Sequence, residues 1–126
     1  MTVHHSLISR IRNRLTEFAR RRRFSRAIEH IHGSNFVVPK GEVLAIVLVR
    51  DGAYYLDAFF DYYRQMGIKY FSFIDNGSTD ETLERLQKED GVVIDRVVLP
   101  LAQYEDLIRG YPAQTYGQDR WCLYVD

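Results

Sequence analysis

The sequence predicts an α/β fold in which a parallel β-sheet carries helices on both faces, preceded by a basic N-terminal helix. Apolar runs at 43–49, 92–99 and 121–125 have the length of strands. The run 43–49 lacks the alternation of a half-exposed sheet, which is typical of a strand buried on both faces. Between these runs, apolar residues recur every three or four positions, as in helices. Alternating strands and helices predict one layered domain with right-handed crossovers.

Composition is that of a folded domain, but charge is divided unevenly along the chain. The 126 residues are 46% hydrophobic and 27% charged, enough for a single core. Residues 1–35 carry eight arginines and two glutamates, a net charge of +6, and the rest of the chain carries −6. We therefore divide the chain into a basic amphipathic helical segment (1–35), a linker (36–42) and an α/β domain (43–126).

The basic segment predicts a helix over 6–32 with one apolar stripe and an arginine-rich opposite face. The stripe consists of Leu7, Ile8, Ile11, Leu15, Phe18, Phe24, Ile28 and Ile31. Packing on its own domain is the simplest interpretation. The alternative is an anionic membrane surface or a partner chain, contacted through Arg20, Arg21, Arg22 and Arg23. We do not expect nucleic acid as a partner, because the body is acidic and no binding module is recognisable.

Isolated side chains suggest neither a metal site nor a disulfide. His4, His5, His30 and His32 lack the spacing of metal ligands, so we interpret them as surface residues. Cys122 is the sole cysteine and lies in an apolar run, which indicates a buried thiol in a reducing compartment. We expect a cytoplasmic location, with the inner membrane face as a possible peripheral site.

The domain is predicted to run strand, helix, strand, helix, strand, a doubtful interval, and strand. The first helix covers about 56–66 and ends at Gly67; the second strand begins at Tyr70. Ser78 and Glu81 match a capping box, which predicts a helix at about 80–88. In 101–117 a short helix should be interrupted at Gly110 and Pro112, with 111–117 a loop or second short helix. This order is half of a Rossmann-like architecture. Neither GxGxxG nor GxxxxGK[ST] occurs, so no dinucleotide cofactor or ATPase is indicated.

Polar residues follow two of the predicted strands directly. Arg50 and Asp51 end the first, and Asp75 and Asn76 end the second. The carboxyl ends of parallel strands usually hold the ligand of such a sheet. An Asp-Asn-Gly sequence is also common in plain turns, so the local pattern leaves both interpretations open.

The combination VLVRDGAYYLDAFFDYYRQMGIKYFSFIDNGSTDETLERL with RWCLYVD resembles the family 2 glycosyltransferases over about residues 43–126. The resemblance implies a GT-A fold that binds a nucleotide-diphosphate sugar. It places Arg50 and Asp51 beside the base, and Asp75 and Asn76 on base or ribose. Gly77 and Ser78 would complete the nucleoside-binding turn. Asp126 matches the first carboxylate of the D-x-D motif, which holds Mn²⁺ or Mg²⁺ on the diphosphate.

The chain also departs from that family's pattern. Asp51-Gly52 stands where the family usually has Asn-Glu, and Tyr62-Tyr63 where it has His-Tyr. The second carboxylate, the acceptor-binding half and the usual catalytic base would all follow Asp126. We therefore expect a nucleotide-binding half without a catalytic residue of its own, not active alone. The alternative is a non-catalytic domain that binds a membrane or partner through its arginine-rich helix. Sugar, acceptor and oligomeric state stay open.

Overall fold

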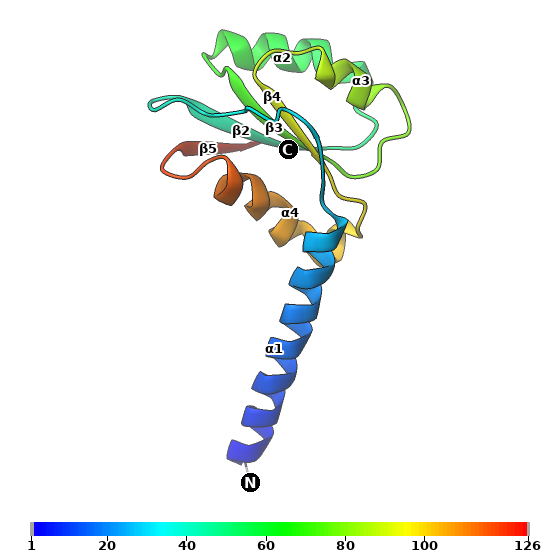
Figure 1. The fold of residues 1–126 in the computed structure, drawn as a ribbon, viewed down its shortest axis with the longest axis vertical. Helices are drawn as coiled ribbons and strands as arrows, with labels where there is room; N and C mark the ends of the chain where they lie inside the picture. The colour runs from blue at the N-terminus through cyan, green and yellow to red at the C-terminus, as the bar shows by residue number, and fades with distance from the viewer. Residues whose placement is uncertain (1, 126) are drawn as a thin grey trace.

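The computed structural model describes residues 2–125, with side chains from residue 6 onward, and shows a layered α/β domain with a long N-terminal helix (Figure 1). The predicted α/β class is confirmed. Five strands form one sheet in the order β1-β4-β3-β2-β5. They are β1 (Glu29–His32), β2 (Val43–Val49), β3 (Tyr70–Asp75), β4 (Val92–Arg96) and β5 (Trp121–Val125).

The sheet is mixed and not purely parallel, because β1 runs antiparallel to β4. The four other strands pair in parallel. The prediction of an all-parallel sheet was therefore wrong at one edge. The added strand covers an edge of β4 that would otherwise present unpaired backbone groups to solvent.

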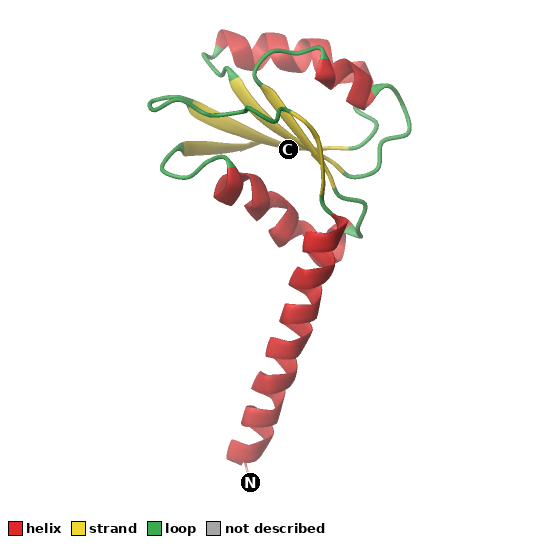
Figure 2. Ribbon diagram, in the orientation of Figure 1, coloured by secondary structure: helices red, strands yellow, loops and turns green. Residues whose placement is uncertain are grey.

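Helices cover both faces of the sheet (Figure 2). The short 3-10 turn η1 (Ala53–Tyr55), α2 (Leu56–Gln65) and α3 (Thr82–Gln87) lie on one face, and α4 (Leu101–Thr115) on the other. Successive β3 side chains point to opposite faces. Phe71 and Phe73 pack with Phe60 of α2, whereas Ile74 packs with Ile108 of α4. Both faces are therefore buried along β2, β3 and β4, as predicted. At the edge strand β5 the prediction was wrong, because Trp121 is 84% exposed and Cys122, expected to be buried, is only partly buried.

Helix α4 carries the chain from one side of the parallel strands to the other. After β4 at one side of the parallel set, α4 carries the chain past β3 and β2 to β5 at the other side. The direction of strand addition thus reverses between β2 and β5. In open α/β sheets, ligands bind outside the carboxyl ends of the strands at such a reversal.

The predicted helix over 6–32 is two elements, α1 (Thr2–Ala27) and β1. Glu29 and His30 pair with Arg96 and Asp95 of β4. His30 is exposed, as predicted for a surface histidine, and its Nδ1 lies 3.1 Å from Oδ1 of the buried Asp95. The apolar spacing continues through Ile28 and Ile31, but pairing with β4 overrides it. Residues 29–32 thus belong to the sheet and not to the basic helical segment.

The predicted break in 101–117 was also wrong, because α4 is continuous from Leu101 to Thr115. Pro112 lies in its last turn, where the missing N–H deprives the helix of a single backbone bond. Tyr104, Ile108 and Pro112 form its buried face. Burial of that face holds the last turn together.

Helix α1 leaves the body of the domain and extends away from it (Figures 1 and 2). Only its last turns pack on α4, where Phe24 is buried and makes an edge contact with Tyr111. Within the described chain, none of the helices has both the length and the apolar character needed to cross a membrane.

Candidate functional site

A cleft of about 600 Å³ opens at the carboxyl ends of the parallel strands. It is lined by residues 48–50 at the end of β2, 76–77 after β3, and 98–101, where the chain passes from β4 into α4. Its size is within the range typical of small-molecule sites. Three segments far apart in sequence thus form one concave surface, at the edge where the sequence predicted a ligand.

Arg50 is the basic side chain of this cleft. It is exposed, and it makes no hydrogen bond or ion pair with any described residue. Its guanidinium therefore keeps all its donors for a ligand. Of the residues predicted to bind, Arg50 is the one that the structure leaves entirely available.

Asn76 lines the same cleft but also holds it together. Its Nδ2 donates to the carbonyl oxygens of Val97 at 2.8 Å and Leu99 at 3.1 Å. Its backbone N–H donates to the carbonyl of Val49 at 2.9 Å. The side-chain oxygen is the atom left to accept a hydrogen bond from a ligand. Asn76 thus joins the ends of β2 and β3 to the segment after β4.

Asp75 lies on the other side of the sheet from Asn76, because neighbouring residues of a strand face opposite ways. It is fully buried and does not line the cleft. Its Oδ2 accepts hydrogen bonds from the backbone N–H groups of Gly77 at 3.1 Å and Ser78 at 3.0 Å. Asp75 therefore shapes the turn that Gly77 contributes to the cleft. A direct contact between Asp75 and a ligand stays a prediction.

Arg96 at the end of β4 is a residue that sequence reasoning missed. Its Nε lies 3.6 Å from Asp75 Oδ2 and is buried without a hydrogen-bond partner among the described residues. Oδ1 of Asp75 is likewise buried and unpartnered there. Arg96 lies inside the run 92–99 that was predicted as one strand, whereas β4 ends at Arg96, so a search of the predicted strand ends did not reach it.

Asp51 and Ser78 join the loop after β2 to the loop after β3. Ser78 Oγ accepts the backbone N–H of Asp51 at 2.9 Å. In return, Asp51 Oδ1 accepts the backbone N–H groups of Thr79 at 2.6 Å and Asp80 at 3.2 Å. Asp51 adopts the uncommon left-handed backbone conformation, with φ of 50°. Both side chains are thus occupied in positioning the loops beside the cleft.

The predicted capping box of Ser78 and Glu81 was wrong. Helix α3 begins at Thr82, and Glu81 before it makes no side-chain cap hydrogen bond. Asp80 performs the capping: its Oδ1 accepts the backbone N–H of Thr82 at 2.9 Å and also its hydroxyl. The Thr82 hydroxyl holds the pKa of Asp80 below its usual range, so this carboxylate stays ionised.

The residue expected to bind a divalent cation falls outside the described part of the chain. That residue is Asp126, so the position of its carboxylate is not part of this structure. Within the described part of the chain, no three His, Cys, Asp or Glu side chains converge on one point. Asp51, Asp75 and Asp80 each accept backbone N–H groups instead. These three carboxylates have structural partners, so they do not form a ready set of cation ligands.

Comparisons with known proteins add no assignment: no family model, curated protein or solved structure matches this chain significantly.

Proposed function

We propose that this chain is the nucleotide-sugar-binding part of a glycosyltransferase of the family 2 type, with a GT-A-like sheet. The observation that carries the proposal is the cleft that Arg50, Asn76 and Gly77 share at the strand ends. These are three of the residues that the family resemblance assigns to the nucleoside.

The walls of the cleft suit a nucleoside. Leu48, Val98 and Leu99 supply apolar surface, on which a planar base can pack. The Arg50 guanidinium is planar and can stack beside that base. The free Asn76 oxygen can accept a hydrogen bond from the base or a ribose hydroxyl. Base and sugar can therefore be recognised by groups already in place.

In glycosyl transfer, an acceptor oxygen bonds to the anomeric carbon of the sugar while the bond from that carbon to the diphosphate breaks. Negative charge then collects on the leaving diphosphate. This chain's proposed part is to bind and orient the donor. The Asp75 and Asp51 hydrogen bonds keep the two loops in position, so that less conformational entropy is lost on binding. No general base is assigned to this chain.

The test is an NMR titration of the chain with UDP, GDP and their sugars, with and without Mg²⁺. Binding should shift the amide signals of residues 48–50, 76–77 and 98–101. Arg50→Ala should weaken binding about tenfold, without unfolding the domain, because its side chain is exposed and unpaired among the described residues.

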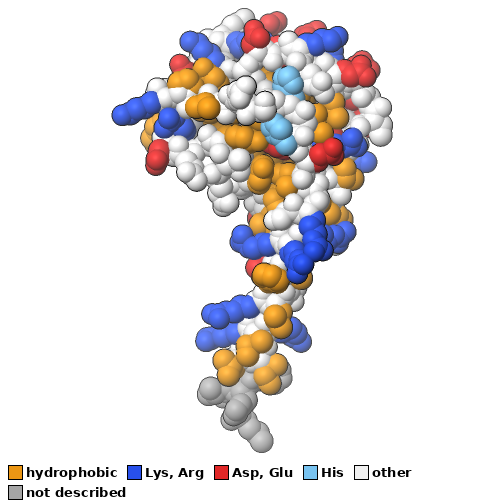
Figure 3. Space-filling model, viewed as in Figure 1, with side chains coloured by type: hydrophobic (Ala, Val, Ile, Leu, Met, Phe, Trp, Pro, Cys, Tyr) orange, Lys and Arg blue, Asp and Glu red, His pale blue; other side chains and the backbone are white. Residues whose placement is uncertain are grey.

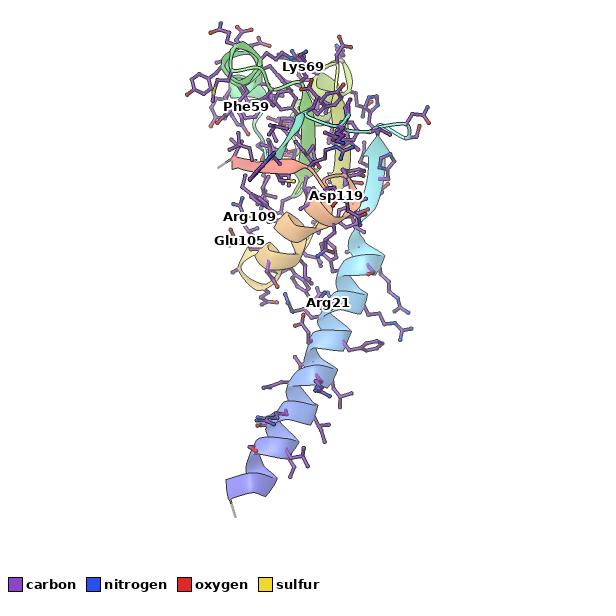
Figure 4. All side chains as sticks on the ribbon, turned by 90° about the vertical axis from the view of Figure 1, so that its left-hand side faces the viewer. Arg21, Phe59, Lys69, Glu105, Arg109 and Asp119 are labelled. Carbon is purple, nitrogen blue, oxygen red and sulfur yellow. The ribbon has the colours of Figure 1, made fainter. Side chains whose placement is uncertain are left out.

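Lys69→Ala is the matched control. Lys69 is also exposed and basic, but it precedes β3 at the opposite end of the strands from the cleft (Figure 4). The Lys69→Ala variant should bind the nucleotides as tightly as the wild type does. If none of these nucleotides shifts the cleft signals at concentrations of about 1 mM, the proposal fails. Equal loss in both variants would show a general charge effect and no site at Arg50.

A further inference from the structure

Helix α1 carries a second surface, independent of the cleft. Its apolar stripe consists of Leu7, Ile8, Ile11, Leu15 and Phe18, each between 53% and 66% exposed. None of these five side chains belongs to a core cluster of the domain. An unbroken row of large exposed apolar side chains normally marks an interaction site. The predicted packing of this part of the stripe on the domain was therefore wrong.

The stripe lies on the side of α1 that faces away from the body. Arg20, Arg23, Phe24 and Ala27 make the contact with α4. At about 100° per residue, the stripe is centred roughly 160° around the helix from them. Helix α1 can thus stay docked on α4 while its apolar stripe contacts another surface.

Arginines flank the stripe on both sides. On the helical projection, Arg12 lies along one side, and Arg10, Arg14 and Arg21 along the other. Figure 3 shows apolar side chains along α1 with basic ones to either side. Arg22 follows the stripe in line after Phe18. Glu17 is the helix's sole acid and is paired with Arg20 and Arg21. The surface around the stripe is therefore almost wholly cationic.

We propose that α1 docks on an anionic lipid surface, with residues 7–18 lying in the plane of the interface. The apolar stripe enters the boundary between headgroups and acyl chains, and the flanking guanidinium groups meet the lipid phosphates. Arginine suits this role, because its fork of donors matches phosphate and its aliphatic stem can lie along apolar surface.

Two of the four arginines predicted to contact a membrane, Arg20 and Arg23, contact α4 instead. Arg20 forms a two-pronged ion pair with Asp106 of α4 and also donates to the carbonyl of Gln103. The Arg23 guanidinium lies over the Tyr104 ring, 5.6 Å from its centre. These two hold the helix to the body. Arg10, Arg12, Arg14, Arg22 and Arg26 are exposed, and their guanidinium groups have no partner among the described residues, so they are available to lipid.

Pairing of α1 with a second copy fits the charges less well. With Ile8, Ile11, Leu15 and Phe18 as the seam of a coiled coil, Arg12, Arg14 and Arg21 fall at the flanking positions that pair across the dimer. In a parallel dimer Arg21 would then face Arg26 of the second copy, whereas Arg12 and Arg14 would face Leu7 and Ala19. Arg22 takes the next seam position and ends the seam after two heptads.

Vesicle co-sedimentation of the full 126-residue chain tests the proposal. The chain should bind to vesicles of phosphatidylcholine with roughly 30% phosphatidylserine. It should bind much less to vesicles of phosphatidylcholine alone. Raising NaCl from about 0.1 to about 0.5 M should weaken binding, because salt screens the guanidinium groups. The double variant Ile11→Glu with Leu15→Glu should lower the partition coefficient at least about tenfold.

The matched control is Ser9→Glu with Asn13→Glu. It adds the same charge at the same spacing on the other face of α1, so it should keep most of the binding. Circular dichroism melting should show that both double variants stay folded. If both double variants lost vesicle binding equally, the interaction would depend on net charge alone, and the apolar stripe would have no role in it.

Failure of the wild type to sediment with either vesicle would overturn the proposal outright. Light scattering then identifies the alternative: a dimer that Ile11→Glu with Leu15→Glu dissociates would assign the stripe to self-association. The nucleotide titration uses different residues, so either proposal can fail without the other.

Discussion

Tyr116, just after α4, donates a 2.8 Å hydrogen bond to Oδ2 of the buried Asp95 in β4. Oδ1 of the same carboxylate lies 3.1 Å from His30 Nδ1 in β1. Asp95 thus connects the end of α4 to the edge strand. Tyr116→Phe should lower the free energy of unfolding by about 1–3 kcal/mol, because it leaves a buried carboxylate oxygen unpaired. Urea denaturation measures this, and Tyr62→Phe at an exposed position should leave stability unchanged.

The same tyrosine predicts a loss of stability at alkaline pH. Burial, and then its hydrogen bond to Asp95, raise the pKa of Tyr116 above the ordinary value of 10.0. Above pH 10 the unfolded chain releases this proton while the folded chain keeps it, so the unfolded state gains as pH rises. The free energy of unfolding should therefore fall more steeply between about pH 9.5 and 11 in the wild type than in Tyr116→Phe. Equal slopes in the two proteins would contradict the assignment.

Asn76→Ala should destabilise the domain as well as alter the cleft. It leaves the carbonyls of Val97 and Leu99 without the amide that joins them. We expect a loss of about 1–3 kcal/mol in urea denaturation. Asn76→Asp should lose more at neutral pH, because its carboxylate would face two carbonyl oxygens. Arg50→Ala should keep wild-type stability, so stability as well as nucleotide affinity distinguishes these neighbours.

Gly91 should resist substitution more than Gly41 does. Both have a positive φ, 71° and 90°, so alanine at either should cost about 1–2 kcal/mol in backbone strain. At Gly91 a Cβ would also overlap the carbonyl oxygen of Lys69, whereas at Gly41 it would meet nothing within 4 Å. Gly91→Ala should therefore melt clearly below Gly41→Ala. Coinciding melting curves would mean that the 69–91 approach is looser than the structure shows.

Docking of α1 on the body should depend on Asp106. Hydrogen bonding to Arg20 lowers the pKa of Asp106 from 3.8 to about 2. The ion pair between Arg20 and Asp106 should be complete above about pH 4 and should be lost as pH falls through about 2. Asp106→Asn should speed amide hydrogen exchange at residues 20–27 at neutral pH. Glu105→Gln is the control, since Glu105 pairs with Arg109 along α4 and not with α1 (Figure 4).

The strands were predictable because their signal is local. The run Val43–Val49 and the run Trp121–Val125 are apolar in sequence and are strands in the structure. β1 was not predictable in this way. Its four residues, EHIH, make a poor strand alone, and they become one through pairing with β4, more than 60 positions away.

The sequence predicted where the cleft lies, but it did not predict most of the hydrogen bonds around it. Strand ends marked the edge where the cleft opens, and Arg50 and Asn76 do line it. Ser78 and Glu81 misled because the partners that decide the turn, Asp51 among them, come from another loop. That Asp75 and Asn76 face opposite ways follows from strand alternation, so this split could have been predicted.

A single residue, Ile28, separates α1 from β1, and it packs against the core of the domain. A helix connected so briefly to an edge strand has no hinge of its own. The orientation of the α/β body is therefore set by the orientation of α1. Whatever surface holds α1, whether lipid or protein, would set the tilt of the sheet and the direction in which the cleft opens.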